Sequence, residues 1–367
     1  MRATFTPEQV EIDRTIAEMS AGGLLDARHC LEHGFREPAY DAALLTDYGQ
    51  LGLPEAAGGF GSSLVDLAIA VEALGRTLAP SRLPAQAAAI QLAAAAGVDV
   101  GEAAEGRARW TIAADEPAAD GPSGWVAALE PDSSLSGSKT LVPHARGADA
   151  LVVVAGEEVA LVRADDAPRA GGADAPAAAG ADSAALTART SLDPTRPVWD
   201  VQLDGLDVLA SGPLGDGLLR ATVVAAADLC GAGLGAVRLG ADYARERKQF
   251  GKPIGSFQAV AFQLVDAFVG VKAAWDLTLF AAWAVEQGDP RAASAVHGAK
   301  ARAGQAALFA AERCTQVHGG MGITLEADPH LFSRRALGSD AWLGSARWHR
   351  RTLGRMRLAG VAEPVPA

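Results

Sequence analysis

The sequence has 367 residues, of which 49% are hydrophobic, and 32 basic against 44 acidic side chains give it a net charge of −12. This length predicts two or three structural units with sizeable cores, and the composition excludes disordered, collagen-like and disulfide-scaffold proteins. The acidic balance provides no bulk field for nucleic acid or an anionic membrane, and three widely spaced cysteines argue against a zinc cluster.

The N-terminus lacks the pattern of an export signal. It becomes charged at once, in MRATFTPEQVEIDRTI, and no later stretch reaches about 18 uninterrupted apolar residues. We therefore expect a soluble, cytoplasmic protein that binds no nucleic acid, no membrane and no metal.

Residues 1–107 predict a helical domain. Apolar residues recur at helical spacing from Thr6 to about Glu105. Ser63 and Asp66 form a capping-box pattern at the start of LVDLAIAVEALGRTLA, and a glycine cluster predicts a turn before it.

Residues 108–212 predict a small β domain. Short β-type runs such as WTIAA, ALVVVA and EVALVRA alternate with Gly, Pro, Asp and Ser. Ser136–Lys139 matches the hydrolase motif S-x-x-K, but the partner motifs are missing, so we interpret it as a turn between strands. Residues 164–188 are almost wholly Ala, Gly, Asp, Pro and Ser, which predicts a loop.

Residues 213–367 predict a second helical domain. One long helix begins near Leu218 and ends by Gly251. A second helix has apolar residues at steps of three or four over residues 254–279, and a third covers residues 292–317. A glycine-rich turn and a final Arg-rich helix follow.

Two short patterns suggest sites that their context disfavours. Gly231, Gly233 and Ala236 fit the dinucleotide fingerprint G-x-G-x-x-A, but no turn precedes them and the acidic residue expected about 20 positions later is missing. We therefore favour close helix packing over a Rossmann turn. His29 and His33 would share one helix face, but no third metal ligand is evident.

Two other segments are more informative. Arg245–Gln258 joins a cationic helix end to a Gly-Pro turn and a new helix, and Gln316–Thr324 places a double glycine after a helix. Backbone N–H groups at such glycines can approach a phosphate closely, and arginine offers the charge-assisted donors that a pyrophosphate prefers. The two segments together predict a phosphate-binding site.

These segments, RERKQFGKPIGSFQAV and QVHGGMGIT, resemble the flavin-dependent acyl-CoA dehydrogenases, as do GLPEAAGGFGSS and EALGRTLAP. The resemblance covers nearly the whole chain and implies an α+β multidomain fold with an N-terminal helical domain, a middle β domain and a C-terminal four-helix bundle. It also implies that FAD is bound across a subunit interface. The residues implied by motif to bind FAD are Arg247, Gln249, Phe250, Phe257, Gln258, Gln316, Gly319, Gly320 and Ser345.

The resemblance implies α,β-desaturation of an acyl thioester, in which a Glu takes the α-proton and the flavin takes the β-hydride. The family's Tyr-Glu-Gly-Thr motif corresponds to Trp342–Ser345, so Leu343 occupies the position of the base. Other members carry the Glu near the start of the long helix, where this chain has Arg220–Thr222. Asp340 and Asp216 are the remaining candidates, although each has a simpler role, as a solvated loop acid and as a helix cap respectively.

The middle domain departs from the family as well. The family's Thr-Glu-Pro loop appears as ADEPAADGPSG, and its flavin-lining Trp-Ile-Thr appears as Leu141–Pro143. The chain most resembles short bacterial members, some of which form mixed complexes in which one partner carries the base. We expect a homodimer, a homotetramer or a heterotetramer with a homologous subunit, acting on an acyl-CoA or acyl-carrier thioester. A flavoenzyme with different oxidation chemistry and a non-catalytic family member remain alternatives.

Residues 331–360 hold seven arginines against one acid, Asp340, which gives a local charge of +6. Solvated helix surface explains such a patch most simply, because arginine stems cover apolar surface well. We nevertheless expect part of it to face phosphates of the flavin or of the acyl carrier.

Overall fold

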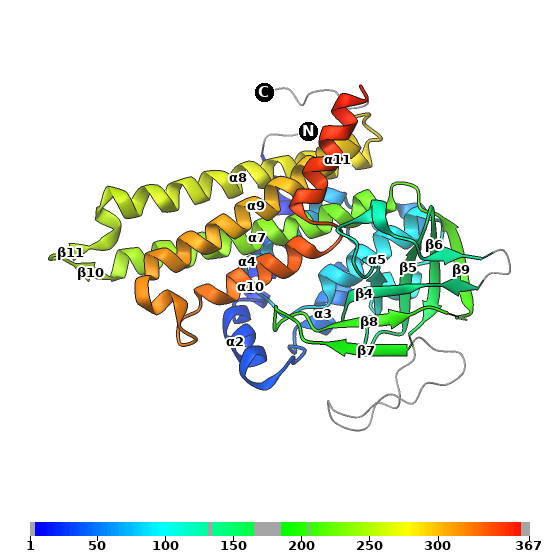
Figure 1. The fold of residues 1–367 in the computed structure, drawn as a ribbon, viewed down its shortest axis with the longest axis horizontal. Helices are drawn as coiled ribbons and strands as arrows, with labels where there is room; N and C mark the ends of the chain where they lie inside the picture. The colour runs from blue at the N-terminus through cyan, green and yellow to red at the C-terminus, as the bar shows by residue number, and fades with distance from the viewer. Residues whose placement is uncertain (1–3, 131–133, 165–184, 205, 361–367) are drawn as a thin grey trace.

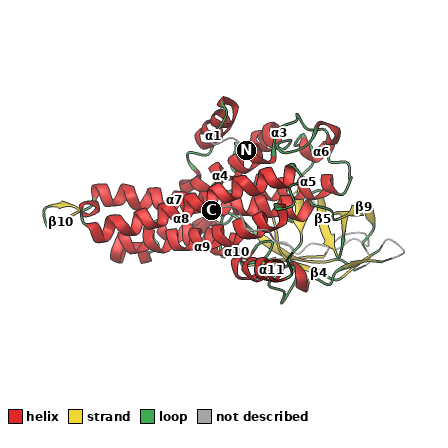
Figure 2. Ribbon diagram, turned by 90° about the horizontal axis from the view of Figure 1, so that it is seen from above, coloured by secondary structure: helices red, strands yellow, loops and turns green. Residues whose placement is uncertain are grey.

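The computed structural model describes residues 4–130, 134–164, 185–204 and 206–360, with helices at both ends of the chain and sheets between them (Figure 1). Seen from above, long helices ending in a short hairpin form one end of the molecule, and the strands of the larger sheets gather at the other (Figure 2). The predicted fold class is therefore confirmed.

Helices account for most of the described chain before Trp110. The predicted capping box at Ser63 is present, because its hydroxyl accepts the backbone N–H of Asp66 and the Asp66 carboxylate accepts that of Ser63. Thr6 begins the first helix with a second capping box. The elements are α1 (Pro7–Met19), α2 (Gly23–His33), α3 (Asp41–Tyr48), the 3-10 turn η1 (Glu55–Ala57), α4 (Leu64–Thr77), α5 (Leu83–Ala95) and α6 (Gly101–Ala104).

The strands form two main sheets. The first has the order β1-β5-β6-β9, with β1 parallel to β5 and the other pairs antiparallel, and the second has the antiparallel order β4-β8-β7. The strands are β1 (Trp110–Ala113), β2 (Ala128–Leu129), β3 (Leu135–Ser136), β4 (Ser138–Pro143), β5 (Ala150–Ala155), β6 (Glu158–Arg163), β7 (Ala185–Arg189), β8 (Val198–Gln202) and β9 (Val208–Pro213).

Two predictions in this region have different outcomes. The turn within Ser136–Lys139 is confirmed, since Gly137 joins β3 to β4 with a φ of 111°, and Lys139 is buried in an ion pair with Glu116. The predicted loop is wrong at its end, because Ala185–Arg189 pairs with β8 along its whole length. Ladder hydrogen bonds are made by the backbone, so they do not require apolar side chains. Residues 165–184 of that loop lie outside the described residues.

The C-terminal region consists of long helices. The predicted final Arg-rich helix is two helices, because the chain leaves helical geometry between Ala341 and Ala346. The elements are α7 (Gly217–Glu246), β10 (Lys248–Gln249), β11 (Lys252–Pro253), η3 (Ile254–Ser256), α8 (Gln258–Glu286), α9 (Ala292–His318), η4 (Gly319–Ile323), α10 (Pro329–Ala341) and α11 (Ala346–Leu358).

Glycines bring α4 and α7 into close contact. Gly231 lies inside α7 rather than after a strand, so the Rossmann interpretation is excluded. A Cβ added at Gly231 would lie 2.1 Å from the carbonyl oxygen of Glu72, and one at Gly75 would lie 2.5 Å from that of Asp228. Close helix packing is therefore the reason for these small residues.

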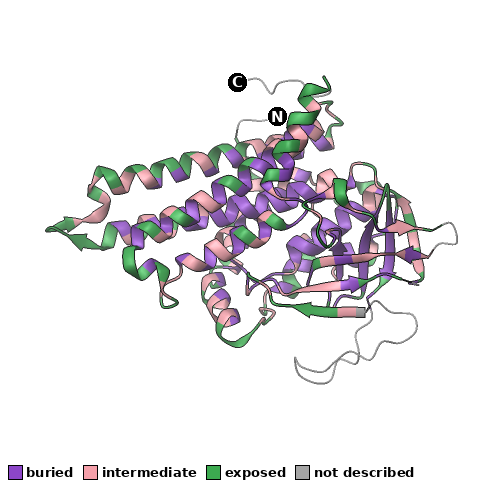
Figure 3. Ribbon diagram, in the orientation of Figure 1, coloured by how far each residue is buried: buried purple, intermediate pink, exposed green. Residues whose placement is uncertain are grey.

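Helices α7 and α8 are long and apolar enough to cross a membrane, but both belong to the helical core. The most apolar window of α7 is 83% buried in the fold and that of α8 is 50% buried. Figure 3 shows buried residues running along the centre of the helices, with exposed residues on the outer side of α8.

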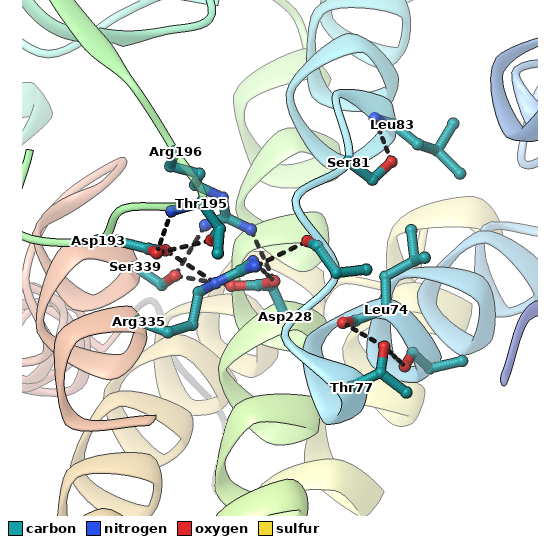
Figure 4. A network of polar contacts seen from close by, with 12 residues as sticks. Leu74, Thr77, Ser81, Leu83, Asp193, Thr195, Arg196, Asp228, Arg335 and Ser339 are labelled. Carbon is teal, nitrogen blue, oxygen red and sulfur yellow. Dashed lines mark hydrogen bonds and ion pairs between the residues drawn. The ribbon is translucent and has the colours of Figure 1, made fainter. Parts of the chain in front are cut away.

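A buried polar network joins the three regions of the chain (Figure 4). Arg335 of α10 donates to Asp228 of α7 at 2.9 Å and to the carbonyl of Ala79 after α4 at 2.9 Å, and its Nε lies 2.8 Å from a carboxylate oxygen of Asp193, between β7 and β8. Arg196, from the same connection, donates to Asp228 at 2.6 Å. Two cations therefore face two anions, which is the condition under which charges can be buried.

Breaking this network should destabilise the fold strongly. Burial alone would raise the pKa of Asp228, but Arg196 and Arg335 overcome that effect and lower it. Asp228→Asn leaves two buried guanidiniums without their shared anion, so we expect a loss of about 3–5 kcal/mol in the free energy of unfolding, measured by denaturant titration. Arg14→Met, which removes only exposed pairs on α1, is the control and should leave that free energy unchanged. Equal stability of both variants would contradict the argument.

The buried carboxyl of Glu72 predicts a pH dependence. Burial raises its pKa to about 7, against the attraction of Arg76, whose Nη1 lies 3.3 Å away. The folded state then holds a proton that an unfolded Glu, with a pKa of about 4.3, releases, so this contribution to stability is full below about pH 4.3 and is lost as the pH rises through 7. Glu72→Gln should flatten the stability profile between those pH values. An unchanged slope would refute the assignment.

Candidate functional site

The first predicted phosphate-binding segment forms the tip of the long helices, at the left end of the molecule in Figure 1. Arg247 caps the C-terminus of α7, and an antiparallel hairpin of β10 and β11 follows it. Phe250 turns this hairpin with a φ of 53° and is 93% exposed. Its ring meets that of Phe257 edge to face, with centroids 6.1 Å apart. Gln249 and Gln258 are exposed beside these residues.

The second segment ends α9 at the same tip. The ring of His318 stacks on that of Tyr243 of α7, with centroids 4.1 Å apart. Because this contact fixes the end of α9 against the end of α7, the fold brings the two sequence segments together. Gln316, Gly319 and Gly320 are exposed there, as expected of residues that meet a partner or a ligand.

A separate cavity of about 240 Å³ lies between the second sheet and α10. Asp228, which belongs to the network beside this cavity, is 18 residues before Glu246 on α7, so the tip lies about 27 Å further along that helix. None of the predicted FAD-binding residues lines the cavity. Its lining residues are Ala85, Leu141, Pro143, Thr190, Ser191, Leu192, Asp193, Arg196, Val198, Leu337, Gly338, Ala341 and Trp342.

The cavity wall is largely apolar, and its charges are already paired. Asp193 and Arg196 take part in the buried network, and the Arg196 guanidinium lies 5.6 Å from the centroid of the Trp342 ring. Leu141 and Pro143 come from β4. Pro143 has no backbone N–H, so this residue cannot donate a hydrogen bond to a group in the cavity.

Position 343 points into the core. Leu343 is fully buried, belongs to a large apolar cluster and does not line the cavity. Its φ of 59° is unusual for a residue with a side chain. The backbone is held by its surroundings, because the N–H donates to Asp115 at 2.9 Å and the carbonyl bonds to Nε2 of His349 at 3.0 Å.

The buried His349, which bonds this carbonyl, and the half-buried His297 beside it are neutral. Burial lowers the pKa of His297 to about 4 and that of His349 to about 2. Since a carbonyl only accepts, Nε2 of His349 carries its proton and Nδ1 is an acceptor. Nδ1 of His297, 2.8 Å from it, is therefore the donor. The pair fixes the turn between α10 and α11.

Asp115 and Lys300 were not predicted from the sequence. Asp115 follows β1 in the stretch that departs from the family pattern, which was the available signal, and burial raises its pKa to about 6. Lys300 is fully buried in α9, and burial lowers its pKa to about 8. No motif marks a lysine inside an amphipathic helix, so only the structure identifies it.

The two candidate bases lie away from the cavity. The Asp340 carboxylate accepts the backbone N–H of Ala346 at 3.0 Å and borders a hollow on the other side of α10. Asp216 occupies the N-cap position of α7 but makes no cap hydrogen bond, contrary to the predicted cap role, and pairs with Arg220 at 2.9 Å. Neither residue lines the cavity.

The arginine patch is smaller than predicted. Arg335 is buried in the network and Arg334 donates to the carbonyl of Leu192. The other five arginines are exposed on α11, and two of them, Arg347 and Arg350, border the open hollow beside Asp340. Ser345 begins α11 as its N-cap, with its hydroxyl accepting the N–H of Trp348.

No group of three or more His, Cys, Asp or Glu side chains that could hold a metal ion occurs among residues 4–130, 134–164, 185–204 and 206–360. The rings of His29 and His33 are tilted by 57° with their centroids 4.7 Å apart, and His33 lies near Glu32.

Comparison with known proteins gives one consistent family. Residues 217–358 match the acyl-CoA dehydrogenase C-terminal domain. The acyl-CoA dehydrogenase IpdE2 of Mycobacterium tuberculosis is 32% identical over 80% of this chain and 78% of its own length. The acyl-CoA dehydrogenase FadE34 of the same organism is 32% identical over 98% of this chain, which spans 49% of FadE34.

Solved structures agree over the whole chain. A variant of the Tcur3481–Tcur3483 steroid ACAD matches with a TM-score of 0.83 and 28% identity, over 97% of this chain and 99% of that one. The ChsE4–ChsE5 complex from Mycobacterium tuberculosis matches with a TM-score of 0.82 and 27% identity, over the full length of both chains.

Proposed function

The chain belongs to the acyl-CoA dehydrogenase family, and from this premise we propose that it is the subunit without a catalytic base in a heteromeric enzyme that desaturates an acyl thioester. A homologous partner subunit supplies the carboxylate that takes the α-proton. This chain completes the partner's FAD site with the tip formed by α7, the hairpin and α9. FAD, when bound, supplies the acceptor for the β-hydride.

The observation that carries the proposal is that, among the described residues, the only carboxylate lining the cavity is that of Asp193, which is already paired with Arg335. A general base has to reach the proton that it removes, at about 2.6–3.2 Å or through one water. Leu343 is apolar and buried in the core, and Asp340 and Asp216 are bound elsewhere. The ChsE4–ChsE5 complex is a related assembly with two differently named components.

The residues at the tip fit the anionic part of FAD. Arg247 is exposed, and Gly319 and Gly320 present backbone in a turn where an added Cβ would meet nothing within 4 Å. A diphosphate can therefore approach this backbone closely while Arg247 supplies charge-assisted donors; the Gly319 N–H itself already donates to the carbonyl of Gln316. The tip lies about 27 Å along α7 from the network beside the chain's own cavity, which supports its use by a neighbouring subunit.

The size of the cavity supports the proposal that this chain does not form a complete flavin and substrate site of its own. Its volume of about 240 Å³ is below the roughly 300–1,000 Å³ typical of ligand pockets. Pro143 also removes a donor from the wall that the family uses for the flavin.

Removing Arg247 should weaken FAD binding by about ten- to a hundredfold, because a charge-assisted contact to the pyrophosphate is lost. Flavin fluorescence titration of the complex with its native partner measures this for Arg247→Ala. The matched control is Arg14→Ala, which removes an exposed arginine that pairs only with Glu11 and Glu18 on α1 and should leave FAD binding unchanged. Absence of flavin from the wild-type complex, even after FAD is added, would refute the FAD assignment.

The isolated chain should be a poor dehydrogenase, because loss of general-base catalysis costs about 10²–10⁴-fold in rate. Anaerobic titration with a panel of acyl thioesters, with and without the partner, measures flavin bleaching. We expect rapid bleaching only in the complex, unchanged by Asp340→Asn or Asp216→Asn. Rapid bleaching by the homomer would overturn the proposal, and its loss in either variant would identify the base.

A further inference from the structure

The turn between α10 and α11 is strained and forms the edge of the cavity. Leu343 and Gly344 have φ values of 59° and 92°. The left-handed backbone conformation is unfavourable for a residue with a side chain, such as Leu343, and persists only where surrounding contacts fix it. The two residues before the turn, Ala341 and Trp342, line the cavity. Their position therefore depends on whatever holds the turn in place.

Lys300 of α9 bridges this segment. Its Nζ donates to the carbonyl of Asp340 at 2.9 Å and to that of Gly344 at 3.0 Å, so the two bonds span both cavity-lining residues between them. The lysine is fully buried, and no ion pair of its ammonium within 4.0 Å occurs in the described part of the chain. Asp340 and Asp115 attract its charge from beyond ion-pair distance, so the two carbonyl oxygens are the direct partners that offset the cost of burying the amine.

The opposite side of the turn is held from the β region. Asp115, which follows β1, accepts the N–H of Leu343 at 2.9 Å. Lys300 from the helical core and Asp115 from the β region thus hold the backbone of the turn by hydrogen bonds, and His349 of α11 adds a third at the Leu343 carbonyl. Hydrogen bonds from three separate parts of the fold stabilise a backbone conformation that is unfavourable by itself.

We propose that Lys300 is a positioning residue of the cavity: its buried amine, with Asp115 opposite, fixes the strained turn at Leu343 and thereby sets the Trp342 face that a flavin ring or acyl head group meets. The assignment of a ligand to the cavity rests on the proposed function. The fixing of the turn does not.

Hydrogen exchange of the full chain, followed by mass spectrometry, tests the turn without any ligand. Lys300→Met keeps the length of the side chain and removes both donors, so we expect the amides of Leu343 and Gly344 to exchange about ten- to a hundredfold faster. The matched control is Lys272→Met on α8, where the lysine is exposed and pairs with Asp276. It should leave exchange in the turn unchanged. Equal exchange in Lys300→Met and in the wild type would overturn the proposal.

Asp115 variants keep the test decisive if Lys300→Met unfolds the whole chain. Asp115→Asn retains an oxygen that can accept the Leu343 N–H, whereas Asp115→Leu does not. We expect fast exchange at residues 343 and 344 in the Leu variant and rescue in the Asn variant. If exchange is fast in neither variant, or equally fast in both, the proposal that Asp115 holds the turn opposite Lys300 is wrong.

Flavin spectra of the complex with its partner connect the turn to the ligand. If a flavin ring enters this chain's own cavity and faces Trp342, Lys300→Met should shift the visible absorption band of that flavin, whereas Arg247→Ala should lower the flavin occupancy of the partner's site without changing the band. An unshifted band would refute the claim that the turn positions Trp342 against the flavin, even if hydrogen exchange confirms that Lys300 fixes the turn. Absence of flavin from the wild-type complex would instead be a failure of the proposed function.

Discussion

The buried contacts of Asp228 determine how the three regions of this chain fit together. One carboxylate in the middle of α7 receives Arg335 from α10 and Arg196 from the connection between β7 and β8, and Arg335 also bonds the chain after α4. An unpaired charge at this depth would be prohibitively costly, so the helical and β regions must approach with the geometry that pairs every member. The cavity beside Arg196 exists because that approach is fixed.

The same arrangement separates the exposed tip around Arg247 from the cavity lined by Trp342. The exposed tip around Arg247 lies about 27 Å along α7 from Asp228, whose network borders the cavity lined by Trp342. Two sites of one chain that bound the same ligand would need to be adjacent. Their separation is the physical basis of our proposal that each tip serves another subunit.

Polar side chains whose burial costs free energy surround Leu343, the position that the family resemblance assigns to the base. Asp115, Lys300 and His349 each bind the backbone of the turn, His297 bonds only His349, and none of the four lines the cavity. The backbone of the turn is thus fixed by polar contacts although the side chain at position 343 is apolar. In the proposed function, this backbone keeps the shape of the cavity while the partner subunit supplies the base.

Local patterns in the sequence determined the elements of this protein, and tertiary contacts decided what they do. The capping box at Ser63, the helical periodicities and the small residues of α7 could be predicted because each depends on neighbours within a few positions. The strand at Ala185–Arg189 could not, because a ladder is made with a distant partner. Motifs identified Arg247 and Gln316, yet only the stacking of His318 on Tyr243 brings their helix ends together. Likewise, Lys300 and Asp115 become partners of one turn only after α9 and β1 pack on opposite sides of it, since the free energy of a buried polar contact is set by burial, which the sequence does not contain.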